Sequence, residues 1–204
     1  MKILDKQRRT SYRYEKLLAM IKMPISMLTI QSIVWPIDIL FDDNDNFLGY
    51  VMKQIIQGTT LNMISSKTEY SLYKKLIIAK NLCSVLNSIH KDELICGDLN
   101  PRNIKVDINT GRVTLVDIDS FNVVDKDTGK EFRCEVGVPE HLPREIHELL
   151  SEHRDCNLLN LPKNPFTRAT DLFALAVHIF SLLMNGCHPF SCSIADEIDM
   201  SGEI

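Results

Sequence analysis

Residues 96–103 read Cys96-Gly97-Asp98-Leu99-Asn100-Pro101-Arg102-Asn103, and residues 116–121 read Val116-Asp117-Ile118-Asp119-Ser120-Phe121. The first stretch places an Asn five positions after an Asp, and the second adds two more Asp residues. Carboxylate and amide oxygens are the ligands that hard divalent cations prefer. Phosphoryl transfer depends mainly on position and charge, with such ligands around the metal ions. The two stretches therefore predict a phosphoryl-transfer site built from Asp98, Asn103 and a later carboxylate.

The segment between the two stretches predicts a β-hairpin. Residues 103–107 and 113–119 have strand-like composition, and residues 108–111, Ile-Asn-Thr-Gly, suit a turn. Such a hairpin brings Asn103 back beside Asp119. Alternation along the strand puts Asp117 and Asp119 on the same side and does not choose between them. We prefer Asp119 as the metal ligand because an aromatic residue follows it closely.

Isolated Asp residues usually cap turns or lie solvated at the ends of strands. Here further features continue in a fixed order, which makes a chance match to the whole set improbable. They are residues 137–145 (Gly-Val-Pro-Glu-His-Leu-Pro-Arg-Glu), 169–177 (Ala-Thr-Asp-Leu-Phe-Ala-Leu-Ala-Val) and 186–190 (Gly-Cys-His-Pro-Phe).

With these motifs the chain resembles the eukaryotic-like protein kinase superfamily, and within it the bacterial kinase-like branch with G-D-L in the catalytic loop and D-S-F in place of D-F-G. The resemblance implies an α+β, two-lobed protein-kinase-like fold with a reduced N-lobe and a mainly helical C-lobe. Residues 1–57 are expected to form a partial N-lobe with the hinge, and residues 58–204 a C-lobe truncated at its C-terminal end. The domain is thus expected to be truncated at both ends.

The same resemblance assigns roles to the motif residues. Asp98 is expected to orient the attacking hydroxyl as catalytic base, and Asn103 and Asp119 are expected to hold magnesium beside ATP. Residues 139–145 match the region that ends the activation segment. Asp171 matches the buried Asp that opens the long central helix of the C-lobe. We expect the last two features to be structural.

The nucleotide-binding side of the site is expected from the first 57 residues. Lys2 resembles the lysine that pairs with the α- and β-phosphates, and Glu15 is the candidate glutamate that pairs with that lysine. Glu15 lies in residues 11–22, a predicted amphipathic helix with Tyr14, Leu17, Leu18 and Ile21 at helical spacing. Strands are expected around residues 35–36 and 47–52. The hinge that pairs with adenine is expected at Met52, Lys53, Gln54 and Ile55.

Several departures from the kinase pattern leave three functions open. No G-x-G-x-x-G lid is present, Gly97 replaces the usual Arg, and Asn100 replaces a Lys that contacts the transferring phosphate in many Ser/Thr kinases. The first reading is an ATP- and magnesium-dependent kinase of Ser or Thr hydroxyls on an unidentified protein. The second is a catalytically impaired pseudokinase or remnant domain that acts by binding. The third is a small-molecule phosphotransferase, which the Pro-Glu segment and the Asp171 helix disfavour.

Composition narrows the remaining classes of partner. The 204 residues carry a net charge of −4 and are 45% hydrophobic, with Lys and Arg scattered along the chain. Without a basic stripe we expect no nucleic-acid partner, and without a long apolar run we expect no membrane partner. Six cysteines without a C-x-x-C pair indicate reduced thiols and a cytoplasmic protein. Cys187, His188 and Cys192 lack a fourth ligand, which disfavours a zinc site.

Two further elements are predicted from periodicity. Residues 69–91 should form a long amphipathic helix whose apolar positions recur at helical spacing. Those positions are Leu72, Leu76, Ala79, Leu82, Leu86 and Ile89. The Gly58-Thr59-Thr60 stretch is expected to mark the boundary between the two lobes.

Overall fold

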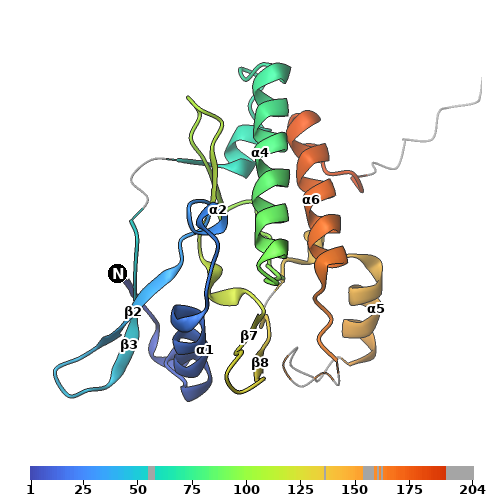
Figure 1. The fold of residues 1–204 in the computed structure, drawn as a ribbon. Helices are drawn as coiled ribbons and strands as arrows, with labels where there is room; N and C mark the ends of the chain where they lie inside the picture. The colour runs from blue at the N-terminus through green and yellow to red at the C-terminus, as the bar shows by residue number, and fades with distance from the viewer. Residues whose placement is uncertain (55–57, 136, 154–158, 160, 162, 192–204) are drawn as a thin grey trace, which may run out of the picture.

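The computed structural model describes residues 1–54, 58–135, 137–153, 159, 161 and 163–191. Helices and small antiparallel sheets alternate along this part of the chain, so the fold is α+β, as predicted, and is compatible with a reduced kinase-like fold. Figure 1 shows α1 beside the sheet that contains β2 and β3, and α4 and α6 side by side beyond it. Ile55 lies outside the described residues.

The first sheet holds Lys2 against the middle of a longer strand. Its order is β1 (Lys2–Ile3), β3 (Phe47–Met52), β2 (Pro36–Phe41), with all neighbours antiparallel. In the register of β1 and β3, Lys2 is opposite Tyr50 and Ile3 is opposite Gly49. A Cβ added at Gly49 would lie 2.1 Å from the carbonyl oxygen of Lys2. The glycine therefore permits the close approach of β1 to β3 beside Lys2.

Helix α1 (Ser11–Lys22) has the predicted bounds, but a different face is buried. The Thr10 side chain accepts a hydrogen bond from the N–H of Arg13, which caps the helix. Of the four expected apolar positions only Leu17 is buried, and the others are partly exposed. The buried residues are Arg13, Lys16, Leu17, Ala19 and Met20. Two cations therefore point into the protein from this helix.

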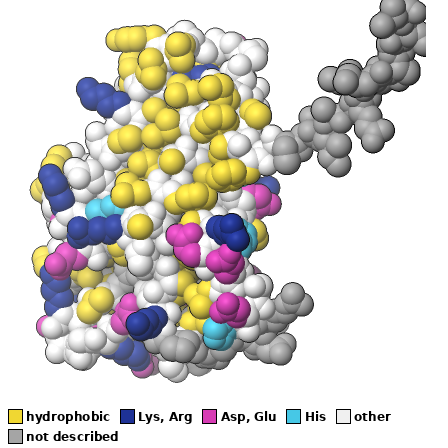
Figure 2. All heavy atoms as spheres, turned by 90° about the vertical axis from the view of Figure 1, so that its right-hand side faces the viewer, with side chains coloured by type: hydrophobic (Ala, Val, Ile, Leu, Met, Phe, Trp, Pro, Cys, Tyr) yellow, Lys and Arg dark blue, Asp and Glu magenta, His cyan; other side chains and the backbone are white. Residues whose placement is uncertain are grey.

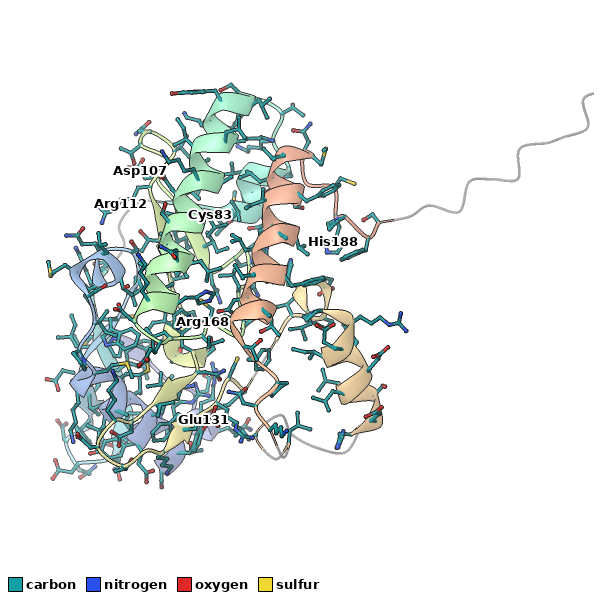
Figure 3. The ribbon with its side chains drawn as sticks, turned by 45° about the vertical axis from the view of Figure 1, so that its right-hand side comes forward. Cys83, Asp107, Arg112, Glu131, Arg168 and His188 are labelled. Carbon is teal, nitrogen blue, oxygen red and sulfur yellow. The ribbon has the colours of Figure 1, made fainter. Side chains whose placement is uncertain are left out.

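The predicted hairpin is present, but its second strand ends at Leu115, so Asp117 and Asp119 do not lie on a strand as expected. Strands β5 (Ile104–Val106) and β6 (Val113–Leu115) pair antiparallel, with Ile104 opposite Leu115. The turn closes through Asp107, whose side chain accepts from the backbone N–H of Asn109 and the hydroxyl of Thr110, both at 2.9 Å. Gly111 follows with a φ of +71°, a conformation that glycine adopts at little cost. Asp107 and Arg112 mark this hairpin in Figure 3.

A second sheet contains the hairpin. Strand β4 (Thr59–Thr60) pairs with β5, so the expected boundary residues form an edge of this sheet. Residues 32–34 join its other side, because the N–H of Leu115 donates to the carbonyl of Ser32 and the N–H of Val34 donates to the carbonyl of Leu115. Beyond β6 the chain forms the 3-10 helix η2 (Ile118–Ser120) and the paired strands β7 (Val123–Val124) and β8 (Glu131–Phe132). The sheet and η2 carry the motifs identified in the sequence.

The larger helical part packs around α4 (Leu72–Lys91) and α6 (Arg168–Leu183). Leu82, Leu86 and Ile89 are buried as expected, but Leu72 is 62% exposed and Leu76 is 49% exposed. The polar residue Lys75 is buried instead and donates to Asn185 at 2.8 Å. The apolar spacing thus predicted a helix here, but the helix begins at Leu72 and not at residue 69, and its first two predicted apolar positions are exposed.

Shorter helices complete the chain between these elements. They are η1 (Lys6–Arg8), α2 (Met27–Ile30), α3 (Leu61–Ser65), η3 (Pro139–His141) and α5 (Arg144–Glu152). Among the helices of the described residues, none is both long and apolar enough to cross a membrane. Figure 2 shows hydrophobic side chains gathered over the upper part of the face on which α6 lies. Exposed members on α6 and just after it are Leu172, Phe180, Met184 and Phe190.

Candidate functional site

Asp119 is the centre of a buried charged cluster between the sheets. It lies on η2, directly after the hairpin strand β6, and is 3% exposed. Its Oδ1 accepts a hydrogen bond from Lys2 Nζ at 2.7 Å, and its Oδ2 accepts one from Arg13 Nη1 at 2.6 Å. Tyr50 completes the shell, because its hydroxyl lies 3.3 Å from Oδ1. The fold therefore brings Lys2 and Asp119 together across 117 positions of sequence.

The electrostatics of Asp119 follow from this shell. Burial raises the pKa of the carboxyl group. The ammonium of Lys2 and the guanidinium of Arg13 lower the pKa by more than burial raises it, so the pKa lies below its ordinary value. Tyr50 responds in the opposite sense. Burial and the charges of Asp119 and Asp117 raise its pKa, so its hydroxyl stays protonated and donates. Lys2 also lies over the Tyr50 ring, 5.6 Å from its centre.

Asp117 is a second partner of the same lysine. Its carboxylate forms an ion pair with Lys2, and its side chain is 46% exposed. The residue has a φ of 60° and a ψ of 41°, the left-handed conformation that Asp tolerates better than most residues. Strand alternation does not choose between Asp117 and Asp119, and Asp119 is the ligand preferred from the sequence. In the structure both carboxylates contact Lys2, and only Asp119 also contacts Arg13.

Asp98 is half-buried and is close enough to Asp117 to be affected by its charge. Burial and the negative charge of Asp117 raise its pKa above the ordinary value, although a backbone hydrogen bond from Val138 partly opposes the shift. The position of Asp98 is fixed by short local bonds, because its N–H donates to the carbonyl of Cys96 at 2.8 Å and its carbonyl accepts from Asn100. A carboxylate with a raised pKa suits a proton acceptor.

Asn103 is held at the base of the hairpin. The carbonyl of Asn103 accepts a hydrogen bond from the N–H of Val116 at 2.8 Å. Asn103 is thereby held opposite the residue that precedes Asp117. Its own N–H donates to the carbonyl of Asn100 at 2.9 Å, so the catalytic-loop motif and the hairpin form one structure. Asp98, Asn103, Asp117 and Asp119 together offer hard oxygen donors, which fits the chemistry of magnesium. Over the described residues, however, no three His, Cys, Asp or Glu side chains converge on a metal site.

The expected pair between Lys2 and Glu15 is absent, which corrects that part of the prediction. Glu15 is exposed and forms an ion pair with Lys130, on the chain between β7 and β8. The residue that α1 directs into the cluster is Arg13, two positions earlier. The helical spacing placed Glu15 on the opposite side, because Arg13 and Lys16 form the inward face.

The remaining predicted nucleotide-binding residues lie where β3 ends. Met52 is the last residue of β3 and is half-buried, and Lys53 and Gln54 follow it as exposed residues. Their side chains are thus open to solvent.

The sequence alone did not predict four residues of this site, which are Arg13, Lys16, Tyr50 and Glu135. Arg13 Nη2 donates to Glu135 at 2.6 Å, and Lys16 Nζ donates to the carbonyl of Arg133 at 3.1 Å. Burial lowers the pKa of Lys16 to about 8. One signal was available, since Arg13 and Lys16 are three positions apart and share a helix face. Their partners follow more than a hundred positions later and leave no local pattern.

A second buried carboxylate, Asp171, binds the backbone of the catalytic-loop motif. It is 1% exposed and lies in the first turn of α6, as predicted. It accepts from the N–H of Cys96 at 2.8 Å, from the N–H of Gly97 at 2.9 Å, and it pairs with His90 Nε2 at 2.9 Å. Beside it, Arg168 joins the start of α6 to the end of α4 by donating to the carbonyl of His90 at 2.6 Å (Figure 3). The loop that carries Asp98 is therefore anchored to two helices.

Comparisons with known proteins give three informative relatives, while no family model matches. Protein kinase YegI of Escherichia coli strain K12 is 28% identical over 155 residues, which cover 71% of this chain and 22% of that protein. The probable serine/threonine-protein kinase irlA of Dictyostelium discoideum is 28% identical over 147 residues, covering 68% of this chain and 9% of that protein. The cAMP-dependent protein kinase catalytic subunit PRKX of Mus musculus is 24% identical over 155 residues, covering 76% of this chain and 38% of that protein.

The matched relatives agree in the class that their names state. Each is named a protein kinase, and this chain spans less than two fifths of the length of any of them. The similarity covers about two thirds or more of this chain in each case, and one of the relatives is bacterial. The chain is therefore similar in sequence to proteins named protein kinases, and its α+β fold is compatible with a reduced kinase-like fold.

Proposed function

We propose that this chain is a kinase-like domain that transfers the terminal phosphoryl group of ATP to Ser or Thr hydroxyls of a protein. In this proposal the substrate hydroxyl oxygen attacks the terminal phosphorus, the bond to the ADP oxygen breaks, and Asp98 accepts the hydroxyl proton. Asn103 and Asp119 would hold magnesium, which would neutralise charge on the phosphates. The raised pKa of Asp98 supports its role as proton acceptor.

The contact between Lys2 and Asp119 is the observation that carries the proposal. Lys2 belongs to β1 and Asp119 follows β6, and the 2.7 Å contact joins the first sheet to the motif region. A lysine beside a metal-binding carboxylate is the arrangement that places phosphates and metal ions in one site. Met52, Lys53, Gln54 and Ile55 are proposed to bind adenine through their backbone groups. Glu15 is not part of this proposal, because it pairs with Lys130.

A binding function without catalysis is the second candidate, and the same cluster favours it. Both oxygens of Asp119 already accept hydrogen bonds from cationic side chains, so the carboxylate is neutralised without a metal ion. The exposed apolar residues on and after α6 offer a surface for a protein partner (Figure 2). A small-molecule phosphotransferase has less support, because the matched relatives are named protein kinases.

A thermal-shift titration with ATP distinguishes these candidates without knowledge of a substrate. A ligand that binds only the folded state raises the unfolding temperature by mass action. We expect a rise with ATP and magnesium that is lost with ATP and chelator, and that is lost in Asp119→Ala. Arg8→Gln, an exposed substitution on η1, is the matched control that should keep the rise. No shift at millimolar ATP would overturn the catalytic proposal and leave the binding function.

Transfer itself is tested on a mixed peptide substrate with labelled ATP. Asp98→Asn should lower the rate by about 100-fold or more, since general-base assistance contributes on that order. The thermal shift with ATP and magnesium should persist in this variant. Full transfer activity in Asp98→Asn would contradict the assignment of the base.

A further inference from the structure

Arg13 and Lys2 together occupy both oxygens of Asp119. Arg13 Nη1 lies 2.6 Å from Oδ2, while Lys2 takes Oδ1 at 2.7 Å. Arg13 is 4% exposed, so its charge is poorly screened by solvent. A divalent cation on Asp119 would lie within a few ångströms of this guanidinium. The two positive groups would repel each other strongly at that depth.

Glu135 holds the other arm of the same guanidinium. Arg13 Nη2 donates to Glu135 at 2.6 Å, and the Glu135 side chain is 25% exposed. Glu135 follows β8. Arg133, on the same segment, also contacts α1, because its N–H donates to the hydroxyl of Tyr12 at 2.8 Å. The guanidinium is thus shared between the carboxylate at the centre of the site and a carboxylate on the segment after β8.

The charges around Arg13 are nearly balanced. Lys2, Arg13 and Lys16 supply the positive groups, and Asp117, Asp119 and Glu135 supply the negative groups. Lys16 donates to a backbone carbonyl, so it contributes charge without contacting Asp119. A divalent cation added to a balanced cluster gains little net attraction unless one positive side chain moves away. Arg13 has an alternative partner in Glu135 and can therefore move away from Asp119.

We propose that Arg13 competes with a divalent cation for Asp119, and that Glu135 weakens this competition by retaining Arg13; the inference rests on the proposed function. In the structure Arg13 contacts both carboxylates, and Asp119 becomes available to the metal ion when Arg13 gives up that contact and keeps Glu135. When that contact is lost, Arg13 binds Asp119 alone and excludes the metal ion. Arg13 is therefore a positioning residue that links α1 and the segment after β8 to metal binding.

Manganese binding at pH 7 tests the proposal, with free Mn²⁺ measured by electron paramagnetic resonance in the absence of nucleotide. Arg13→Gln should bind Mn²⁺ about tenfold more tightly than the wild type, since a close like charge is removed. Arg8→Gln makes the same substitution at an exposed position and should leave the affinity unchanged. Lys16→Met removes a buried charge that does not contact Asp119 and should change it by less than about threefold.

Glu135→Gln gives an independent test of opposite sign. It should weaken Mn²⁺ binding about threefold or more, because Arg13 then has Asp119 as its one charged partner and a nearby negative charge is lost. This variant is partly exposed, so it remains informative if Arg13→Gln does not fold. Binding in Arg13→Gln alone, with none in the wild type, would support the proposal.

The results that overturn the inference differ from those that overturn the proposed function. If wild type binds Mn²⁺, Asp119→Ala abolishes it and neither Arg13→Gln nor Glu135→Gln changes it, the inference fails while the proposed site stands. If Glu135→Gln tightens binding, the coupling is wrong. If no variant binds Mn²⁺ and ATP gives no thermal shift, both proposals fail.

Discussion

Asp119 and Asp171 are both almost completely buried, yet they are neutralised in different ways. Asp171 accepts from two backbone N–H groups and pairs with His90. Asp119 is surrounded by the ends of long side chains, Lys2 and Arg13, and by the hydroxyl of Tyr50. Backbone donors are fixed by the fold, whereas a lysine or arginine side chain can rotate to another partner.

The comparison separates a structural carboxylate from an exchangeable one. The donors of Asp171 cannot leave without unfolding the loop at residues 96–97, so this residue holds the catalytic-loop motif in place. The partners of Asp119 each have a second carboxylate available, Asp117 for Lys2 and Glu135 for Arg13. Burial alone therefore does not distinguish the two roles, but the type of donor does.

The largest expected effect is the loss of stability in Asp171→Ala. This variant leaves two buried N–H groups and His90 without their acceptor, and we expect it to lower the free energy of unfolding by about 4 kcal/mol. Urea unfolding at pH 7 measures the change. Asp171→Asn retains one acceptor oxygen and should cost about half as much. A loss below about 1 kcal/mol in Asp171→Ala would remove the distinction between the two carboxylates.

Asp119→Ala should destabilise the protein less, by about 2 kcal/mol, although the residue is equally buried. Lys2 retains Asp117 and Arg13 retains Glu135, so neither cation is left unpaired. The same urea experiment measures it, with the ATP thermal shift as a second readout. If Asp119→Ala costs as much as Asp171→Ala, Asp119 is a structural anchor as well, and the comparison fails.

Lys16 extends the comparison to pH, since it is a buried cation that forms no ion pair with a carboxylate among the residues described by the structure. Its folded-state pKa of about 8 lies below the ordinary 10.5, so the unfolded state binds more protons between these values. Stability from this group is therefore reduced below pH 8 and increases as pH rises through the window. From pH 7 to 9.5, wild type should gain about 2 kcal/mol relative to Lys16→Met, by the conversion of pKa into free energy.

Urea unfolding of wild type and Lys16→Met at several pH values measures this difference. Subtracting the free energy of unfolding of Lys16→Met from that of wild type cancels the contributions of Tyr12 and Tyr50, because both proteins contain these tyrosines with raised pKa values. A difference that stays constant with pH would mean that Lys16 remains solvated in the folded protein.

The smallest effect is expected for an ion pair at the surface. Arg144 Nε donates to Glu148 at 2.7 Å on α5, but their side chains are 89% and 57% exposed. Glu148→Gln should change the free energy of unfolding by no more than about 0.5 kcal/mol, because exposed pairs are screened and cost side-chain entropy. Thermal unfolding in low and high salt checks this. A loss comparable to that of Asp119→Ala would show that burial is not what gives the central cluster its stability.

The sequence by itself determined the local elements that carry the motifs. The bounds of the helix at residues 11–22, the hairpin turn at Asp107 to Gly111 and the capped start of α6 depend on residues within a few positions of one another. These features follow from capping, turn geometry and periodicity, which act over short stretches of chain. The burial of Asp171 at the start of a helix was instead implied by the resemblance to protein kinases, and it depends on distant partners in the chain.

Only the tertiary structure decided which face of α1 points inward and which carboxylates its cations meet. Helical spacing groups Tyr14 with Leu17 and Leu18 as readily as Arg13 with Lys16, so it does not select the buried face. Arg13 is buried because Asp119 and Glu135, 106 and 122 positions later, compensate for its desolvation. Glu15 pairs with Lys130, and both side chains remain exposed. An ion pair between distant segments depends on how the sheets and helices pack, and local sequence carries no record of that packing.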